Sequence, residues 1–166
     1  MESLSLDLGC GRASQEHWGL DRLPYAGVSV VGDVERLPLL SDSLRKVRFC
    51  HVLEHVDLVG ALREAWRVLQ PGGRALVRVP YFSSVASWAD PTHRRGYAYR
   101  TWGYFERGEY DLPRFRVVHC RLHFKPYGQY LFLDVLINLA PAFFERHLCY
   151  WVGGCHEVSV ELEKPP

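Results

Sequence analysis

A chain of 166 residues, 48% of them hydrophobic, is long enough to bury the core of one domain of ordinary size. Its 20 basic and 19 acidic residues nearly cancel, so the composition predicts no broad positive surface for nucleic acid. Five cysteines without the spacing of a disulfide framework favour a reduced, cytoplasmic protein. No apolar stretch is long and uninterrupted enough to span a bilayer, so no membrane association is expected.

The first part of the chain predicts four short strands, three of which end in an aspartate. These strands cover residues 4–8, 19–21, 28–33 and 47–52. The first is alternating and runs straight into Gly9-Cys10-Gly11, whereas the fourth is apolar at most positions, as expected of a buried parallel strand.

Beyond residue 57 the apolar period changes. Apolar residues recur at three- and four-residue steps, which predicts an amphipathic helix that Pro71-Gly72-Gly73 ends; they are Leu58, Leu62, Ala65, Trp66 and Leu69. Further strands are predicted over 75–80, 115–124 and 156–163, with a helix over 129–144. The segment 81–116 has no clean period and is expected to be a substrate-facing insertion of loops and helix within the single domain of residues 1–166.

Strands that alternate with helices predict an α/β fold with a doubly wound, mostly parallel sheet. The last strand is expected to be antiparallel, and the final two strands are expected to include one antiparallel edge strand. In such a sheet, ligands bind beyond the carboxyl ends of the strands, where Asp7, Asp21 and Asp33 would converge beside the Gly-x-Gly turn. A carboxylate at the second strand is suited to ribose hydroxyls, and one at the third to an adenine amino group.

Four motifs stand in order along the first half of the chain: Asp-Leu-Gly-Cys-Gly (7–11), Gly-Asp-Val-Glu-Arg-Leu-Pro-Leu (32–39), His-Val-Leu-Glu-His-Val (51–56) and Arg-Val-Leu-Gln-Pro-Gly-Gly-Arg (67–74). Together they resemble the class I, Rossmann-like methyltransferases, specifically the type 11 small-methyltransferase group. This resemblance implies a seven-stranded Rossmann-like sheet, S-adenosylmethionine as the cofactor and an enzyme that transfers a methyl group to an acceptor the sequence does not identify. The sequence leaves a homodimer open as the assembly.

The resemblance also assigns cofactor contacts. Gly9, Cys10 and Gly11 would bring backbone near the methionine part, and Asp7 would orient its amino group. Asp21 would hold the ribose hydroxyls, although it follows Gly9 by only twelve residues, which shortens the first crossover helix to about residues 13–18. Asp33 and Val34 would bind the adenine. Cys50 or His51 would lie beside the transferring methyl.

The loop after the fifth strand is the candidate for acceptor chemistry. Trp88 to Tyr97 places an aspartate, a histidine and two arginines where loops concentrate function. We expect His93 or Asp90 to act as the base, and Arg94, Arg95 and Tyr97 to contact the substrate. The alternative, equally compatible with these residues, is a purely structural role, in which Asp90 caps a helix and the arginines are solvated.

Three other functions remain open. A non-catalytic S-adenosylmethionine-binding subunit of a partner enzyme is the main alternative. His51-x-x-Glu54-His55 fits the pattern of inverted zinc peptidases, but that chemistry needs a helix, and the segment leaves a strand; no metal site is therefore expected. A nicotinamide-dependent oxidoreductase is disfavoured because position 14 is serine where the phosphate-binding turn needs a third glycine.

Overall fold

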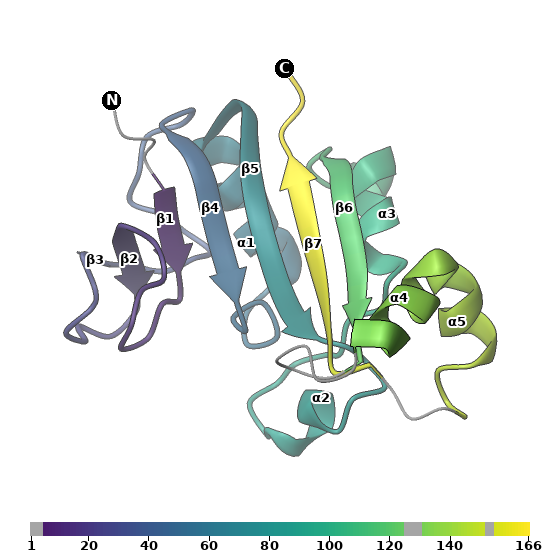
Figure 1. Cartoon of the computed structure of the whole chain (residues 1–166). Coiled ribbons are helices and arrows are strands. Elements are labelled where there is room, and N and C mark those ends of the chain that lie inside the picture. The colour runs from purple at the N-terminus through teal and green to yellow at the C-terminus, as the bar shows by residue number, and fades with distance from the viewer. Residues whose placement is uncertain (1–4, 125–130, 152–154) are drawn as a thin grey trace.

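The computed structural model describes residues 5–124, 131–151 and 155–166, and its centre is one seven-stranded sheet (Figure 1). The strands are β1 (Ser5–Leu8), β2 (Trp18–Asp21), β3 (Val30–Val31), β4 (Leu44–Cys50), β5 (Leu69–Pro80), β6 (Arg116–His123) and β7 (Glu157–Glu163), in the spatial order β3-β2-β1-β4-β5-β7-β6. β1 to β5 are parallel, whereas β7 is antiparallel to both β5 and β6. The expected mostly parallel α/β sheet with an antiparallel last strand is confirmed, and β6 is the expected antiparallel edge strand, with β7 inside the sheet.

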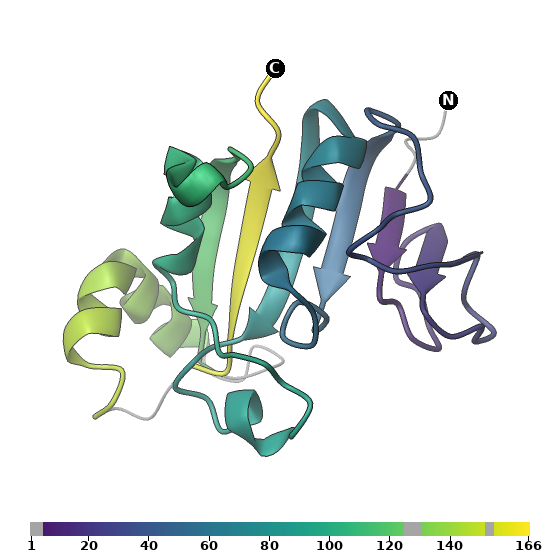
Figure 2. The same cartoon turned by 180° about the vertical axis from the view of Figure 1, so that it is seen from behind.

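Helices lie on both faces of this sheet. They are α1 (Leu58–Val68), α2 (Ala86–Ala89), α3 (Thr101–Arg107), α4 (Leu131–Leu139) and α5 (Pro141–His147), with a 3-10 turn at Glu109–Asp111. Figures 1 and 2 show α1 and α3 on one face and α4 on the other, beside β6. No helix among the described residues is long and apolar enough to cross a membrane.

The sequence explains why α1 forms where it does. The Asp57 carboxylate caps the helix by accepting from the Gly60 N–H at 2.7 Å. The apolar side chains recur on one face and are fully covered against the sheet, because three- and four-residue steps return to the same side of a helix. Those buried residues are Leu58, Ala61, Leu62, Ala65 and Val68.

The opposite face of the central strands is polar. Ala75, Val77 and Val79 of β5 are buried, whereas Arg74 and Arg78, at the alternate positions, are exposed. Each arginine is paired with a glutamate across the β5–β7 ladder, as in the Arg78 Nη2–Glu157 Oε1 ion pair at 2.6 Å. Charged side chains let this part of the sheet remain in water without a covering helix (Figure 1).

Two expectations about the elements were wrong. Residues 13–17 form bends and turns rather than a helix, because the nine residues between β1 and β2 are too few for a helical crossover. The helix expected over 129–144 is broken at Ala140, before Pro141, into α4 and α5; its first two residues lie outside the described residues.

The expected insertion 81–116 contains a helix, α3, whose bounds its lack of a clean period did not reveal. Trp102 and Phe105, three residues apart, are its two buried side chains. Gly108 ends the helix in the left-handed conformation, at φ 64°.

Arg67 on α1 fixes the segment that leads into β4. Its guanidinium donates to the Leu39 carbonyl at 2.8 Å and the Leu37 carbonyl at 3.0 Å, while pairing with Glu64 at 2.7 Å. We expect Arg67→Met to lower the free energy of unfolding by about 1.5–3 kcal/mol, as for other hydrogen bonds to charged groups. Urea denaturation measures it. Arg63→Met is the control, because Arg63 on the same helix pairs with a fully exposed Asp111 carboxylate and its loss should cost under about 1 kcal/mol. Equal losses in the two variants would contradict the prediction.

Candidate functional site

The glycine turn after β1 is an open cradle at the carboxyl edge of the sheet. Gly9 and Gly11 have φ of 69° and 59°, which L side chains rarely adopt. A Cβ on Gly9 would lie 2.5 Å from Val52 Cγ2, so this glycine lets the turn touch the loop after β4. A Cβ on Gly11 would meet nothing within 4 Å, so Gly11 faces unfilled space. Cys10, between them, is half-buried and has a free thiol.

Of the expected cofactor acids, Asp7 lies in β1, Asp21 ends β2 and Asp33 follows β3, and each also orders local backbone. Asp21 accepts from the Gly11 N–H at 2.8 Å and from the Leu23 N–H at 3.0 Å. Asp7 is buried and accepts from the Gln15 N–H at 2.8 Å; burial raises its pKa. These bonds replace those of the missing crossover helix. Because an ionised carboxylate has about four acceptor positions, Asp21 keeps two for a ligand.

The third acid lies at the sheet edge, beyond β3. Asp33 accepts from the Glu35 N–H at 2.9 Å and lies 3.9 Å from the Arg22 side chain. Val34 is buried with only 3% of its surface exposed. The carboxylate of Asp33 is therefore oriented by its own turn, and Val34 anchors that turn to the core.

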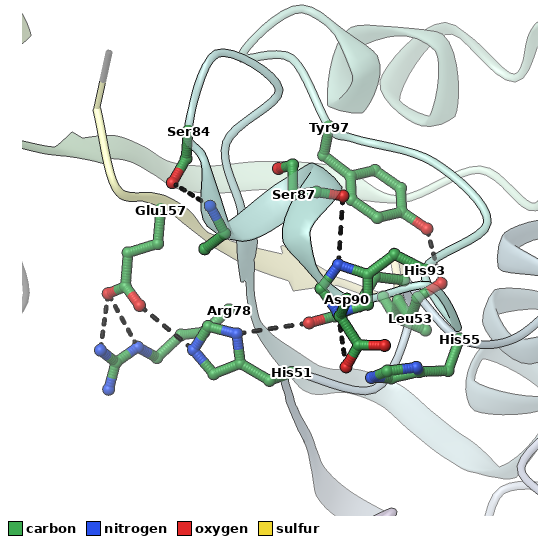
Figure 3. Close-up of polar contacts among 12 residues, drawn as sticks. His51, Leu53, His55, Arg78, Ser84, Ser87, Asp90, His93, Tyr97 and Glu157 are labelled. Carbon is green, nitrogen blue, oxygen red and sulfur yellow. Dashed lines mark hydrogen bonds and ion pairs between the residues drawn. The ribbon is translucent and has the colours of Figure 1, made fainter. Parts of the chain in front are cut away.

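A charged cluster lies at the end of β4, beside Cys50. His51 has a φ of 56°, and its ring lies between two carboxylates, with Nε2 3.4 Å from Glu157 Oε2 and Nδ1 3.3 Å from Glu54 Oε1. Contact with Glu157, followed by Glu54, raises the pKa of His51 to about 10, so the ring is an imidazolium at neutral pH. Burial opposes ionisation of Glu157, but His51 and Arg78 lower its pKa to about 2. Figure 3 shows Arg78, Glu157 and His51 in a row.

The loop that follows α2 is ordered around Asp90. Its Oδ1 accepts from the Thr92 N–H at 2.8 Å and from the Thr92 hydroxyl at 2.7 Å, and these bonds lower the pKa of Asp90. His93 Nδ1 lies 3.2 Å from the Ser87 carbonyl oxygen, and His93 Nε2 lies 3.8 Å from Asp90 Oδ2. The structure thus brings together the two residues that the sequence proposed as alternative bases (Figure 3).

The expected substrate contacts divide into two groups. Arg94 and Arg95 are exposed, and the Arg95 guanidinium lies 5.3 Å above the Tyr97 ring centre. Tyr97 itself is fully buried, and its hydroxyl donates to the Leu53 carbonyl at 2.6 Å. This placement gives Tyr97 a structural role, which is to join the 90–97 loop to the loop after β4.

The buried hydroxyl of Tyr97 should be needed for stability. Tyr97→Phe leaves the Leu53 carbonyl without its donor, and we expect the free energy of unfolding to fall by about 1–3 kcal/mol. Tyr110→Phe is the control, because that side chain is 81% exposed and its change should stay within about 0.5 kcal/mol. Thermal or urea unfolding of both variants measures the difference. A neutral Tyr97→Phe would show that the bond contributes nothing to holding the two loops together.

Two loops 38 residues apart therefore form one site. The Arg94 N–H donates to the Glu54 carbonyl at 2.7 Å, and the rings of His55 and His93 lie edge to face with centres 4.7 Å apart. Glu54, His55, Glu157 and Arg78 were not among the site residues predicted from the sequence; for Glu54 and His55 the signal was the His-x-x-Glu-His pattern. Residues 51–57 form turns, so the helix that the zinc peptidase interpretation needs is not present.

Known proteins match part of this chain in sequence. The family described as "Methyltransferase domain" matches residues 13–77, which is less than half of the chain. The malonyl-[acyl-carrier protein] O-methyltransferase of Alcanivorax borkumensis is 41% identical over 77 residues, a match that covers 44% of this chain and 26% of the relative. The matched segment thus spans about a quarter of that relative's length.

Solved structures resemble almost the whole chain. The YcgJ protein of Bacillus subtilis superposes with a TM-score of 0.63 at 19% identity, covering 99% of this chain and 93% of that one. A SAM-dependent methyltransferase from Archaeoglobus fulgidus gives a TM-score of 0.65 at 19% identity, covering 96% and 85%. At such identities the likeness establishes the fold.

Proposed function

We propose, from the premise that this chain is a class I, Rossmann-like methyltransferase, that it transfers a methyl group from S-adenosylmethionine to a small molecule, a sugar or a group on a larger partner. The family and fold imply S-adenosylmethionine as the cofactor. The observation that carries the proposal is the Gly9–Gly11 turn, which is open at Gly11 and lies beside the Asp21 carboxylate.

The residues present fit this cofactor. Gly11 leaves room for a ligand against the backbone, as a side chain there would not, and Asp21 has two unused acceptor positions for ribose hydroxyls. Asp33 is positioned beyond β3 for the adenine amino group, with the backbone of Val34 beside it. Asp7 would orient the amino group of the methionine part, and Cys10 would bring its backbone near that part of the cofactor.

The methionine end of the cofactor would lie towards β4. Cys50 ends that strand, and His51 follows it with a positive charge held by Glu157 and Glu54. Gly9 touches Val52 in the same loop, which brings the glycine turn and the β4 end together. When bound, S-adenosylmethionine supplies a methyl group on a positively charged sulfur that an attacking atom displaces in line.

The residues of 81–116 would serve the acceptor. We assign the removal of the acceptor's proton to Asp90 or His93, whose side chains face one another 3.8 Å apart. Arg94 and Arg95 are exposed and offer positive charge to an acidic or hydroxylated acceptor. Tyr97 supports these residues from the core.

Calorimetric titration with S-adenosylmethionine, S-adenosylhomocysteine and NAD tests the cofactor. We expect the first two to bind and NAD not to bind; binding of NAD alone would overturn the proposal. A panel of acceptors with mass-spectrometric detection then tests turnover. Binding of cofactor without any methylated product from the purified chain would favour the alternative, a non-catalytic S-adenosylmethionine-binding subunit of a partner enzyme.

Assembly and location are part of the same proposal. We place the protein in the cytoplasm, supported by five free cysteine thiols. A homodimer is supported by exposed apolar side chains on α4 and α5, where Phe132, Leu139 and Phe143 are 72%, 76% and 58% exposed. Sedimentation of the full chain tests this. A nucleic-acid acceptor is disfavoured by the near-zero net charge.

A further inference from the structure

A group of metal-binding side chains lies where the loop after β4 meets the 90–97 loop. Glu54, His55 and His93 each offer one ligand atom, and these atoms all lie within 4.8 Å of one another. Two histidines and a carboxylate are the donor set of catalytic zinc sites and of related transition-metal centres with open coordination positions. We propose that these three residues bind a divalent transition-metal ion of the zinc type.

The burial of the Glu54 carboxylate is the first indication of a bound cation. Its side chain is 1% exposed, and neither carboxylate oxygen accepts a hydrogen bond from any described residue. A buried carboxylate without hydrogen bonds carries a large desolvation cost, and His51 Nδ1 lies 3.3 Å from one oxygen, Oε1, while Oε2 has no hydrogen-bond partner among the described residues. A cation between Glu54 and the two histidine rings would compensate the other.

The second argument is the proton count at His55. The Thr92 hydroxyl has one hydrogen, which it donates to the Asp90 carboxylate at 2.7 Å. The 2.9 Å contact between that hydroxyl and His55 Nδ1 therefore requires Nδ1 to be the donor. In the neutral ring, Nε2 of His55 is left with its lone pair free for a ligand.

The same count applies to His93. Its Nδ1 faces the Ser87 carbonyl oxygen at 3.2 Å, and a carbonyl only accepts, so Nδ1 carries the proton. Nε2 then presents a lone pair, 3.8 Å from Asp90 Oδ2 and beyond hydrogen-bond length. Metal-binding histidines are typically oriented in this way, with the other ring nitrogen donating to a carbonyl, a carboxylate or a group bound to one.

The three ligand atoms are farther apart than the ligand atoms around a bound zinc ion. Ligand atoms around a tetrahedral zinc lie about 3.3 Å apart, from bond lengths of about 2.0–2.1 Å. Closing the present group from 4.8 Å needs movements of about an ångström, which rotation of the partly exposed ring of His55 would supply, whereas His93 has only 9% of its side chain exposed. Glu54 is fixed by burial, and its carbonyl is held by the Arg94 N–H. Glu54 and His93 are therefore the two fixed ligands, and His55 is the adjustable one.

The role of the ion in catalysis, unlike the metal site itself, rests on the proposed function. The ion would bind the oxygen of a hydroxyl or carboxyl acceptor. A bound metal ion lowers the pKa of a coordinated hydroxyl. The ion would occupy His93 Nε2, which leaves Asp90 as the group that receives the acceptor's proton. The oxygen's electron pair would then form the new bond to carbon as the carbon–sulfur bond breaks, with its electrons going to sulfur.

The experiment uses the full chain without a histidine tag, treated with chelator, and titrates Co²⁺ while its visible absorption reports coordination, then Zn²⁺ by calorimetry. We expect one ion per chain for each metal. Glu54→Gln and His93→Ala should weaken binding more than about 100-fold, and Thr92→Ala about 10- to 100-fold through loss of the His55 hydrogen bond. His119→Ala, at an exposed position of β6, is the matched control and should bind as the unaltered chain does.

Failure of Co²⁺ or Zn²⁺ to bind, or binding unchanged in Glu54→Gln and His93→Ala, would overturn the metal site. Circular dichroism of each variant checks folding, and Thr92→Ala, at an exposed position, keeps the inference falsifiable if Glu54→Gln does not fold. No cofactor is present in this titration. A chain that binds the metal but not S-adenosylmethionine would therefore disprove the proposed function while leaving the metal site intact. A chain that binds S-adenosylmethionine but not the metal would disprove the metal site and leave the proposed function intact.

Discussion

Replacing Gly11 by alanine is expected to weaken S-adenosylmethionine binding by about 10- to 100-fold while leaving the chain folded. The new Cβ would project into space that the protein leaves empty, where the cofactor has to approach the backbone. Placing a methyl group in a filled site costs about 1–3 kcal/mol, which gives the stated range. Calorimetry at matched protein concentration measures it.

Gly72→Ala is the control for this variant. Gly72 has a φ of 78°, and its Cβ would also meet nothing within 4 Å, but it lies near the start of β5, at the opposite end of the sheet from the glycine turn. Both substitutions should lower the free energy of unfolding by about 1–2 kcal/mol, because each places a side chain in the left-handed region. Only Gly11→Ala should lose cofactor affinity. Equal affinity in the two variants would show that the cofactor does not approach Gly11.

Asp90→Asn is expected to reduce kcat by about 100- to 10,000-fold for an acceptor that must lose a proton, which is the usual contribution of a positioned base. The amide oxygen of asparagine still accepts the two bonds from Thr92, so the loop should keep its conformation. Affinity for S-adenosylmethionine and for Co²⁺ should stay within about twofold, since Asp90 lies outside both sets of proposed ligands. Single-turnover methyl transfer measures the change.

The control for this substitution is Asp111→Asn, which removes a fully exposed carboxylate outside the site. It should leave kcat unchanged. If Asp90→Asn also keeps full turnover, Asp90 has only a structural role, which is to order its loop through the hydrogen bonds to Thr92. A pH–rate profile adds a second readout, because loss of a base removes the acidic limb of the profile whereas a structural defect lowers all points together.

The elements of this fold that the sequence predicted are those governed by local patterns. The period of apolar residues was sufficient for α1, and alternation was sufficient for β1, β6 and β7. The bounds of α3 were not predicted, because a three-residue spacing of two aromatic residues is too short a signal for a helix of seven residues. The break at Ala140 was not predicted either.

The sequence by itself determined the strands whose ends face the site, the glycine turn after the first strand and the acids at or near the ends of the first three strands. It did so because strand periodicity, turn chemistry and family motifs are all local. Only the tertiary structure decided which side chains meet. The parallel pairing of β4 with β5 places the loops that follow them side by side, so that His55 and His93 come into contact across 38 residues and Glu54 is buried beneath them. Such contacts depend on strand order and loop closure, which no local pattern encodes.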